Sequence, residues 1–254
     1  MRFLGFAVFR DEKGQRLKPI LLFYSVNLEQ SMTIRLFFEA ILKFFLGVLL
    51  VGALLFLPLG SFSYFGGWLL LSVLFVPMFL AGIVMMIKNP ALLASRLDAR
   101  EGRKSQDTVI KLSALMFILG FVTASLSARF SLLTLSPAVS IVGAVIFLIA
   151  YILYAEVLRE NEYLSRTIRV VEGQRVVDTG MYSLVRHPMY SVTLLLFISI
   201  PIVLGSLLAL IPFLFYPFII AKRILDEERL LEAELIGYTE YKQRVKYRLI
   251  PFIW

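Results

Sequence analysis

The residues best suited to chemistry form three polar clusters beside the apolar C-terminal part of the chain. One cluster is the segment 180–190, which contains the chain's single histidine, His187. The second holds Arg223 with Asp226, Glu227 and Glu228, and the third holds Tyr238, Tyr241 and the segment 248–251. Ionisable groups near membrane depth are costly and usually functional. The three clusters therefore predict a functional site.

The apolar stretch 190–221 separates the first two clusters and must bring them together. Gly205-Ser206 interrupt it, which leaves two arms of about 15 residues, each about 22 Å long as a helix. Such arms cross a bilayer only if their polar ends sink into the interface. A tight helical hairpin is the predicted structure, and it returns the chain to its starting face, next to His187.

Four longer apolar runs precede this hairpin, and 59% of the 254 residues are hydrophobic. Each run has about 20 or more residues, enough for a hydrocarbon core about 30 Å thick. The predicted spans are Phe37–Leu59, Ser63–Ile87, Val109–Ala128 and Pro137–Leu158. With the hairpin arms, the chain has about six membrane helices.

Basic residues are strongly biased to one side of these spans. The net charge is +8, and 24 of the 26 Lys and Arg residues fall in the N-terminal segment, in two connections and in the C-terminal tail. The opposite connections contain Arg129 alone. This bias predicts that both termini and the large polar segments are cytoplasmic, and it assigns the basic residues to topology and lipid contact, not to nucleic acid.

The predicted fold is therefore all-α: a polytopic transmembrane bundle with a short C-terminal hairpin and a cytoplasmic C-terminal helix. We expect an interfacial segment at residues 1–36, a two-helix extension with a cytoplasmic loop at 37–108, and a core at 109–254 with its site at 159–254. The absence of cysteine and the single histidine argue against Cys-ligated and multi-His metal sites.

The order of motifs resembles the isoprenylcysteine carboxyl methyltransferase family. The matching elements are Gly180-x-Tyr182, the segment Arg186-His187-Pro188-x-Tyr190, an apolar hairpin, the pair Glu227-Glu228, then Gly237-Tyr238-x-x-Tyr241 and Arg248-Leu249-Ile250-Pro251. The likeness covers about residues 159–254. It departs at Met181, where the family commonly has proline.

This resemblance implies an integral membrane enzyme that methylates with S-adenosylmethionine and does not use the soluble Rossmann fold. Its cofactor would lie against Arg186, His187, Pro188 and Tyr190, with Gly180 and Tyr182 shaping the wall. Glu227 or Glu228 would meet the cofactor's amino or ribose groups, and spacing does not decide which one does so.

The acceptor implied by the resemblance is lipidic, with the carboxylate of an isoprenylcysteine-like substrate favoured and O-methylation as the reaction. An arginine that orients this carboxylate would be the catalytic group, and the candidates are Arg248, then Arg223, with Arg186 a further possibility. A phospholipid or a small thiol is an alternative acceptor.

Two other classes of protein compete with this interpretation. A sterol-type membrane reductase shares an Arg-His-x-x-Tyr pattern but binds NADPH. A non-catalytic transporter or scaffold is less favoured, because the spans have few polar residues near mid-membrane. Taken one at a time, the Arg, Glu and Tyr residues could simply be interface anchors or solvated helix charges.

Overall fold

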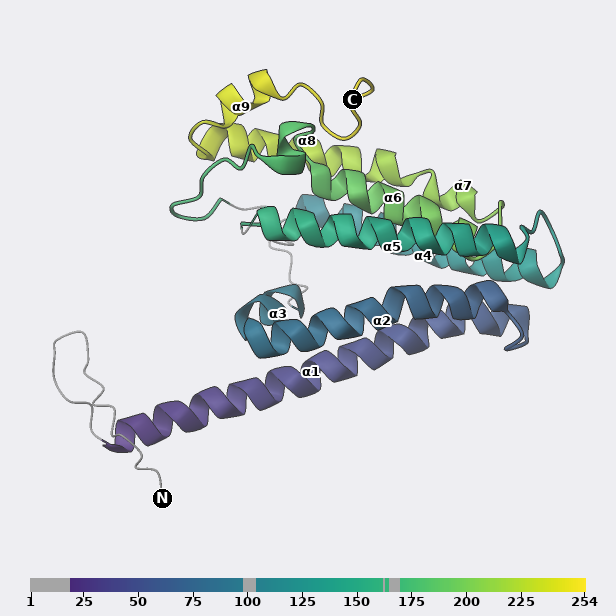
Figure 1. Ribbon diagram of the computed structural model, residues 1–254, viewed down its shortest axis with the longest axis horizontal. Helices are drawn as coiled ribbons and strands as arrows, with labels where there is room; N and C mark the ends of the chain where they lie inside the picture. Colours follow the sequence, from purple (N-terminus) through teal and green to yellow (C-terminus); the bar gives the residue numbers. More distant parts are fainter. Residues whose placement is uncertain (1–18, 98–103, 162, 165–169) are drawn as a thin grey trace.

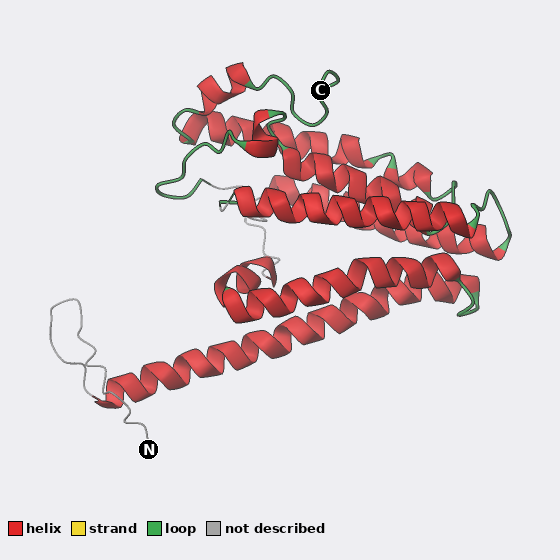
Figure 2. Ribbon diagram, viewed as in Figure 1, coloured by secondary structure: helices red, strands yellow, loops and turns green. Residues whose placement is uncertain are grey.

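The computed structural model describes residues 19–97, 104–161, 163–164 and 170–254. This part of the chain is helical and contains no strand of a sheet (Figure 2). The first five helices are α1 (Pro19–Leu59), α2 (Phe65–Lys88), α3 (Pro90–Leu97), α4 (Lys104–Arg129) and α5 (Pro137–Glu160). They are followed by a 3₁₀ turn, η1 (Gly180–Ser183), and by α6 (Pro188–Val203), α7 (Leu210–Phe213), α8 (Tyr216–Glu234) and α9 (Tyr238–Arg244).

Four helices contain runs long and apolar enough to cross a membrane: Ile34–Leu59, Phe65–Lys88, Asp107–Arg129 and Pro137–Glu160. They agree with the four predicted spans to within a few residues. Their outer faces expose large apolar side chains such as Leu49, Leu57 and Ile152, as expected of helices that face lipid. The protein is a polytopic helical membrane protein.

The first helix is longer than predicted. We expected a separate interfacial segment up to residue 36, whereas α1 already begins at Pro19. Residues 1–18 of that expected segment lie outside the described part of the chain. Lys43 forms an ion pair of 2.6 Å with Glu39, one turn earlier on the same helix.

The predicted hairpin is present as α6, α7 and α8. The 16-residue helix α6 ends at Val203, and Gly205 adopts a positive φ of +68° in the turn that follows. The chain then passes through α7 and returns along α8, beside α6 (Figure 1). The first turn of α8 is apolar, while its second half carries the acidic residues.

The long helices run in roughly the same direction, so the molecule has two distinct ends (Figure 1). We call one the polar end: it carries α3, η1, α9 and the segment 245–254. The other is the far end, with the turns 60–64, 130–136 and 204–209. The hydrophobic core between them is built mainly by α4 to α8 and includes Phe147, Phe213 and Ile224.

Candidate functional site

The site is organised around the N-terminus of α6 at the polar end. His187 is the N-cap residue of this helix and Pro188 occupies its first turn, where proline is favoured because its missing N–H would have no helical partner. The backbone N–H groups of Arg186 and His187 donate to the carbonyls of Tyr247 and Arg248, at 2.8 and 2.9 Å. The C-terminal segment therefore fixes the position of the Arg-His-Pro motif.

A buried ion pair links this motif to α8. Arg186 Nε donates to Glu228 Oε1 at 2.7 Å, and both side chains are only 4% exposed. Arg186 Nη1 also donates to the carbonyls of Val245 and Lys246, at 2.7 and 2.8 Å. A buried pair of this kind is tolerated because further hydrogen bonds satisfy its charged groups.

Glu228 accepts from two more residues. Arg248 Nε lies 2.9 Å from Glu228 Oε2, and His187 Nε2 lies 3.3 Å from Glu228 Oε1. Burial would raise the pKa of Glu228, but the hydrogen bonds from His187, Arg186 and Arg248 hold it at about 2. Glu228 is therefore an anion that joins the motif, α8 and the C-terminal segment.

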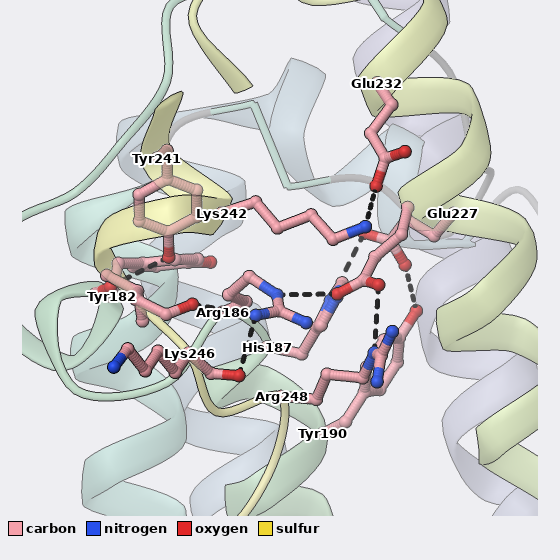
Figure 3. A network of polar contacts seen from close by, with 12 residues as sticks. Tyr182, Arg186, His187, Tyr190, Glu227, Glu232, Tyr241, Lys242, Lys246 and Arg248 are labelled. Carbon is pink, nitrogen blue, oxygen red and sulfur yellow. Dashed lines mark hydrogen bonds and ion pairs between the residues drawn. The ribbon is translucent and has the colours of Figure 1, made fainter. Parts of the chain in front are cut away.

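Glu227, the neighbouring glutamate, has other partners besides His187, whose Nδ1 lies 4.0 Å from Glu227 Oε1. Its Oε2 accepts from the hydroxyl of Tyr190 at 2.7 Å, and that hydroxyl accepts from Arg223 Nε at 2.9 Å. The ring of Tyr190 stacks on that of His187, with centroids 5.8 Å apart. Arg186, His187, Tyr190, Glu227 and Arg248 lie close together in Figure 3.

A pocket opens beside Tyr190, Arg223 and Glu227, and its water-accessible space is about 90 Å³. That space holds only a few waters, so a ligand of nucleoside size has to widen it or extend through its mouth. The lining residues are Asn161, Tyr163, Leu164, Gln174, Arg175, Val176, Val177, Tyr182, Arg186, His187, Met189, Tyr190, Arg223, Glu227, Leu231, Leu235, Tyr238 and Tyr241.

One wall of this pocket depends on η1. Gly180 has a φ of +47°, a backbone conformation that favours glycine. A Cβ on it would lie 2.1 Å from Glu160 Oε1 and would displace that carboxylate. Glu160 in turn accepts from Thr179 Oγ1 and from the N–H of Met181. The turn is thereby held so that Tyr182 faces the pocket.

Tyr182 is fixed by hydrogen bonds on both sides. Asn161 donates to its hydroxyl at 3.0 Å, and the hydroxyl of Tyr241 donates to its carbonyl at 2.8 Å. Tyr238 also lines the pocket, but its buried hydroxyl has no hydrogen-bond partner among the described residues. Burial raises the pKa of Tyr238 far above its usual value, so this hydroxyl stays protonated and can donate to a ligand.

The sequence-predicted residues divide into two groups in the structure. Those that line the pocket are Tyr182, Arg186, His187, Tyr190, Arg223 and Glu227. Those that the described pocket does not include are Gly180, Pro188, Glu228 and Arg248. Each of these supports a lining residue: Gly180 through the turn, Pro188 through α6, and Glu228 and Arg248 through the buried network.

Sequence reasoning missed several lining residues, among them Gln174, Arg175 and Met189, and it gave no role to Tyr238. Tyr238 carried a signal, since it belongs to the tyrosine pair of the third cluster, but its unpaired hydroxyl emerges only from the packing. In the described ranges, no group of three or more His, Asp and Glu side chains could hold a metal ion.

The comparison with protein families agrees with this geometry. Residues 141–233 match the isoprenylcysteine carboxyl methyltransferase family, a segment that includes the Arg-His-Pro motif and both glutamates. This matched segment comprises 93 of the 254 residues, and the likeness to the family is shown for that segment. The match ends before Tyr238 and Arg248.

Two known proteins extend the comparison. One is the structure of a eukaryotic intramembrane Ras methyltransferase, isoprenylcysteine carboxyl methyltransferase. The structural match covers 91% of this chain and 89% of that chain, with a TM-score of 0.50 and 20% sequence identity. That likeness concerns the fold. Delta(14)-sterol reductase of Mus musculus is 31% identical over 91 residues, which are 35% of this chain. The matched part spans only 22% of that reductase's length.

Proposed function

We propose that this protein is an integral membrane methyltransferase that moves a methyl group from S-adenosylmethionine to a lipidic acceptor, with the carboxylate of an isoprenylcysteine-like substrate favoured. The observation that supports this most directly is the pocket beside Glu227, Tyr190 and Tyr238, at the polar end of an apolar bundle. A lipid-anchored acceptor and a soluble cofactor can meet only at such an end.

The lining residues suit the parts of this cofactor. Glu227 is an acceptor for ribose hydroxyls or for the amino group, since a carboxylate accepts strong hydrogen bonds. The stacked rings of His187 and Tyr190 offer an aromatic surface to the adenine. The unpartnered hydroxyl of Tyr238 supplies a donor, whose burial costs less once a ligand accepts from it.

When bound, S-adenosylmethionine supplies a methyl group on a positively charged sulfur. In the proposed reaction, an acceptor carboxylate oxygen would bond to that methyl carbon as the carbon–sulfur bond breaks, and the electron pair of the broken bond would stay on sulfur. The anionic acceptor needs no general base, so the protein's main contribution is to align the two groups.

The two arginine candidates for this alignment differ in their surroundings. Arg223 lines the pocket and donates to the hydroxyl of Tyr190. Arg248 is bound to Glu228 and lies over the ring of Trp254, 5.3 Å from its centroid. We therefore favour Arg223 over Arg248 as the residue that orients the acceptor, a reversal of the order expected from the sequence.

A reductase that binds NADPH is a second candidate, because the match to Delta(14)-sterol reductase is a specific observation in its favour. A similar segment of 91 residues therefore occurs in a protein whose name indicates reduction, not methyl transfer. Cofactor binding distinguishes the two candidates, since the acceptor is not needed to observe it.

The test is calorimetric titration of the purified protein in detergent with S-adenosylhomocysteine, and separately with NADPH. We expect saturable binding of S-adenosylhomocysteine and an affinity at least tenfold weaker in Glu227→Gln, because a hydrogen bond to a charged group contributes about 1.5–3 kcal/mol. Glu232→Gln, on the same helix but paired with Lys242, is the matched control and should bind like the wild type. Binding of NADPH alone would instead make the protein a reductase.

A further inference from the structure

Four successive apolar residues are exposed in the tail loop, which we define as residues 249–254. Ile250, Phe252 and Ile253 are 38%, 87% and 76% exposed, and Pro251 between them is exposed as well. A run of exposed apolar residues is unfavourable in water unless it serves a function. These four residues belong neither to the pocket lining nor to the hydrophobic core, so their surface needs another partner.

The tail loop is a closed turn with an inner and an outer side. The carbonyl oxygen of Trp254 accepts from three successive N–H groups, those of residues 248–250, at 2.8, 2.9 and 3.3 Å. On the inner side, Leu249 and Trp254 pack with the hydrophobic core. On the outer side, Phe252 has a φ of +67°, a conformation that a bulky residue rarely adopts. The backbone thus holds an aromatic side chain away from the bundle.

The position of the tail loop along the bundle follows from the packing of α5 and α6. Gly143 of α5 lies against Ile202 of α6, and α5 runs toward the polar end while α6 runs away from it (Figure 1). Ser191 of α6 therefore lies level with about residue 154 of α5, which is about 9 Å inside the polar end of that helix. Because Ser191 Oγ donates to the carbonyl of Leu249 at 2.6 Å, the tail loop begins at this level.

This level corresponds to the interface of a bilayer. The helix α5 is a candidate membrane span up to Glu160, and interfacial elements bury their apolar side about 5–10 Å into the boundary between headgroups and acyl chains. Aromatic rings are enriched there, and Phe252 contacts the ring of Tyr247, with centroids 5.3 Å apart. Lys246, just before it, is exposed and suits lipid phosphate groups. A lipid surface therefore fits the apolar tip better than a soluble protein does.

We propose that the tail loop is an interfacial anchor, whose apolar tip is inserted into the bilayer leaflet at the polar end. The anchor also positions the site, because the segment before it supports the Arg-His-Pro motif. The carbonyls of Tyr247 and Arg248 accept from the N–H groups of this motif, and the guanidinium of Arg248 binds Glu228. Contact with lipid thereby holds the motif from outside the bundle.

The chain offers matched positions for a test of the anchor. Ile236, in the turn between α8 and α9, is 96% exposed and serves as the apolar control outside the tail loop. Leu49, which is 67% exposed within a membrane span, is the reference for lipid. The chain contains no cysteine, so one introduced cysteine can carry a spin label without a background signal.

The experiment places a nitroxide on Phe252→Cys, Ile236→Cys or Leu49→Cys in phosphatidylcholine vesicles. Collisions are measured with oxygen, which concentrates in lipid, and with a nickel chelate, which stays in water. We expect the oxygen-to-nickel ratio at position 252 to be roughly tenfold higher than at position 236 and close to that at position 49, because lipid excludes the chelate.

Three outcomes would overturn the anchor. A ratio at position 252 equal to that at position 236 would place the tip in water. Low access to both reagents would mean that protein covers the tip, and spin–spin broadening would identify the cover as a second copy of the chain. None of these readouts depends on a ligand, so they decide the anchor independently of the proposed function.

The link between the anchor and the site is tested by titration with S-adenosylhomocysteine in nanodiscs, and this test alone rests on the proposed function. Phe252→Asp should weaken binding roughly threefold, a typical size for coupling through packed contacts, because a carboxylate at the tip leaves the lipid and draws the tail loop with it. Ile236→Asp and Phe252→Leu should bind like the wild type.

Unchanged affinity in Phe252→Asp, or equal weakening in Ile236→Asp, would overturn the link between the anchor and the site. A wild-type protein that binds no S-adenosylhomocysteine would reject the proposed function, while the spin labels still decide the anchor.

Discussion

The two ends of the α6–α8 hairpin are held in place by different kinds of interaction. At the polar end, α6 is joined to α8 by charges: Arg186, His187 and Arg248 all bind Glu228. At the far end, the turn after α6 is held by close backbone packing. A Cβ on Gly66 would lie 2.7 Å from the carbonyl oxygen of Leu204.

Around the hairpin turn, the far end uses small residues and neutral hydrogen bonds. The charged side chain of Arg129, also at this end, donates to the carbonyl of Pro58 at 2.9 Å. A Cβ on Gly143 of α5 would lie 2.8 Å from the backbone nitrogen of Val203, and the hydroxyl of Tyr64 donates to the carbonyl of Leu204 at 2.7 Å. Small residues let membrane helices approach closely, where burial of apolar surface gives no driving force. The hairpin turn at this end is therefore stabilised without a buried ion pair among the described residues.

The polar end is held by buried ion pairs, whose formation costs more free energy than apolar packing. Its buried ions have lost their hydration, and only their mutual contacts offset that cost. The contrast fits our proposal that these charges position pocket residues, since packing would hold two helices together at lower cost. Stability and ligand binding should therefore respond differently to changes at the two ends.

The largest effect is expected from Glu228→Ala. Removing this carboxylate leaves Arg186 buried without its partner, which costs about 3–5 kcal/mol in comparable cases. We expect a large loss of thermal stability in detergent, measured by tryptophan fluorescence. Glu232→Ala, which breaks the more exposed pair with Lys242, should cost no more than about 1 kcal/mol; equal losses in the two variants would contradict a special role for the buried pair.

Acid should weaken the polar end before the far end. Because the folded-state pKa of Glu228 is about 2, below its usual value of 4.5, its stabilising contribution is complete above pH 4.5 and is lost as the pH falls toward 2. We expect the unfolding temperature to decline across this window and the decline to be shallower in Glu228→Gln. Parallel pH profiles for the two proteins would remove Glu228 as the group responsible.

Crowding the far end should reduce stability without changing the ligand site. Gly143→Val forces side-chain atoms into the backbone of α6, and overpacking of this kind costs about 1–3 kcal/mol. The fraction that remains folded should bind S-adenosylhomocysteine with wild-type affinity. Gly52→Val, where a Cβ meets nothing within 4 Å, serves as the control for a valine in a membrane helix.

The smallest effect, and the one that best separates stability from binding, is expected from Tyr238→Phe. Its hydroxyl is buried without a protein partner, so its removal should leave the ligand-free protein equally stable or slightly more stable. Affinity for S-adenosylhomocysteine should fall about tenfold, as for the loss of one hydrogen bond of about 1.4 kcal/mol. Lower stability with unchanged affinity would show that the hydroxyl serves the fold.

The hairpin was predictable from the sequence because its signals are local. Gly205-Ser206 end one apolar arm, and a second arm follows. The return of the chain therefore brings His187 and Glu228 to the same end, where His187 Nε2 lies 3.3 Å from Glu228 Oε1. The start of α1 was not predictable in the same way. Hydropathy reports where a helix enters lipid, but α1 continues from Pro19 into less apolar sequence.

By itself, the sequence determined the four long spans, the hairpin and the grouping of polar residues at one end, since hydropathy and helical rise depend only on the order of residues. It also supplied the family resemblance of the C-terminal part. Spacing left the roles of Glu227 and Glu228 open, because adjacent residues on a helix differ in direction by about 100°, and only the neighbours of α8 decide which direction faces a cavity. The tertiary structure turned Glu227 toward the pocket and Glu228 toward Arg186 and Arg248, and it brought Arg96 of α3 next to Leu164 across a long stretch of chain.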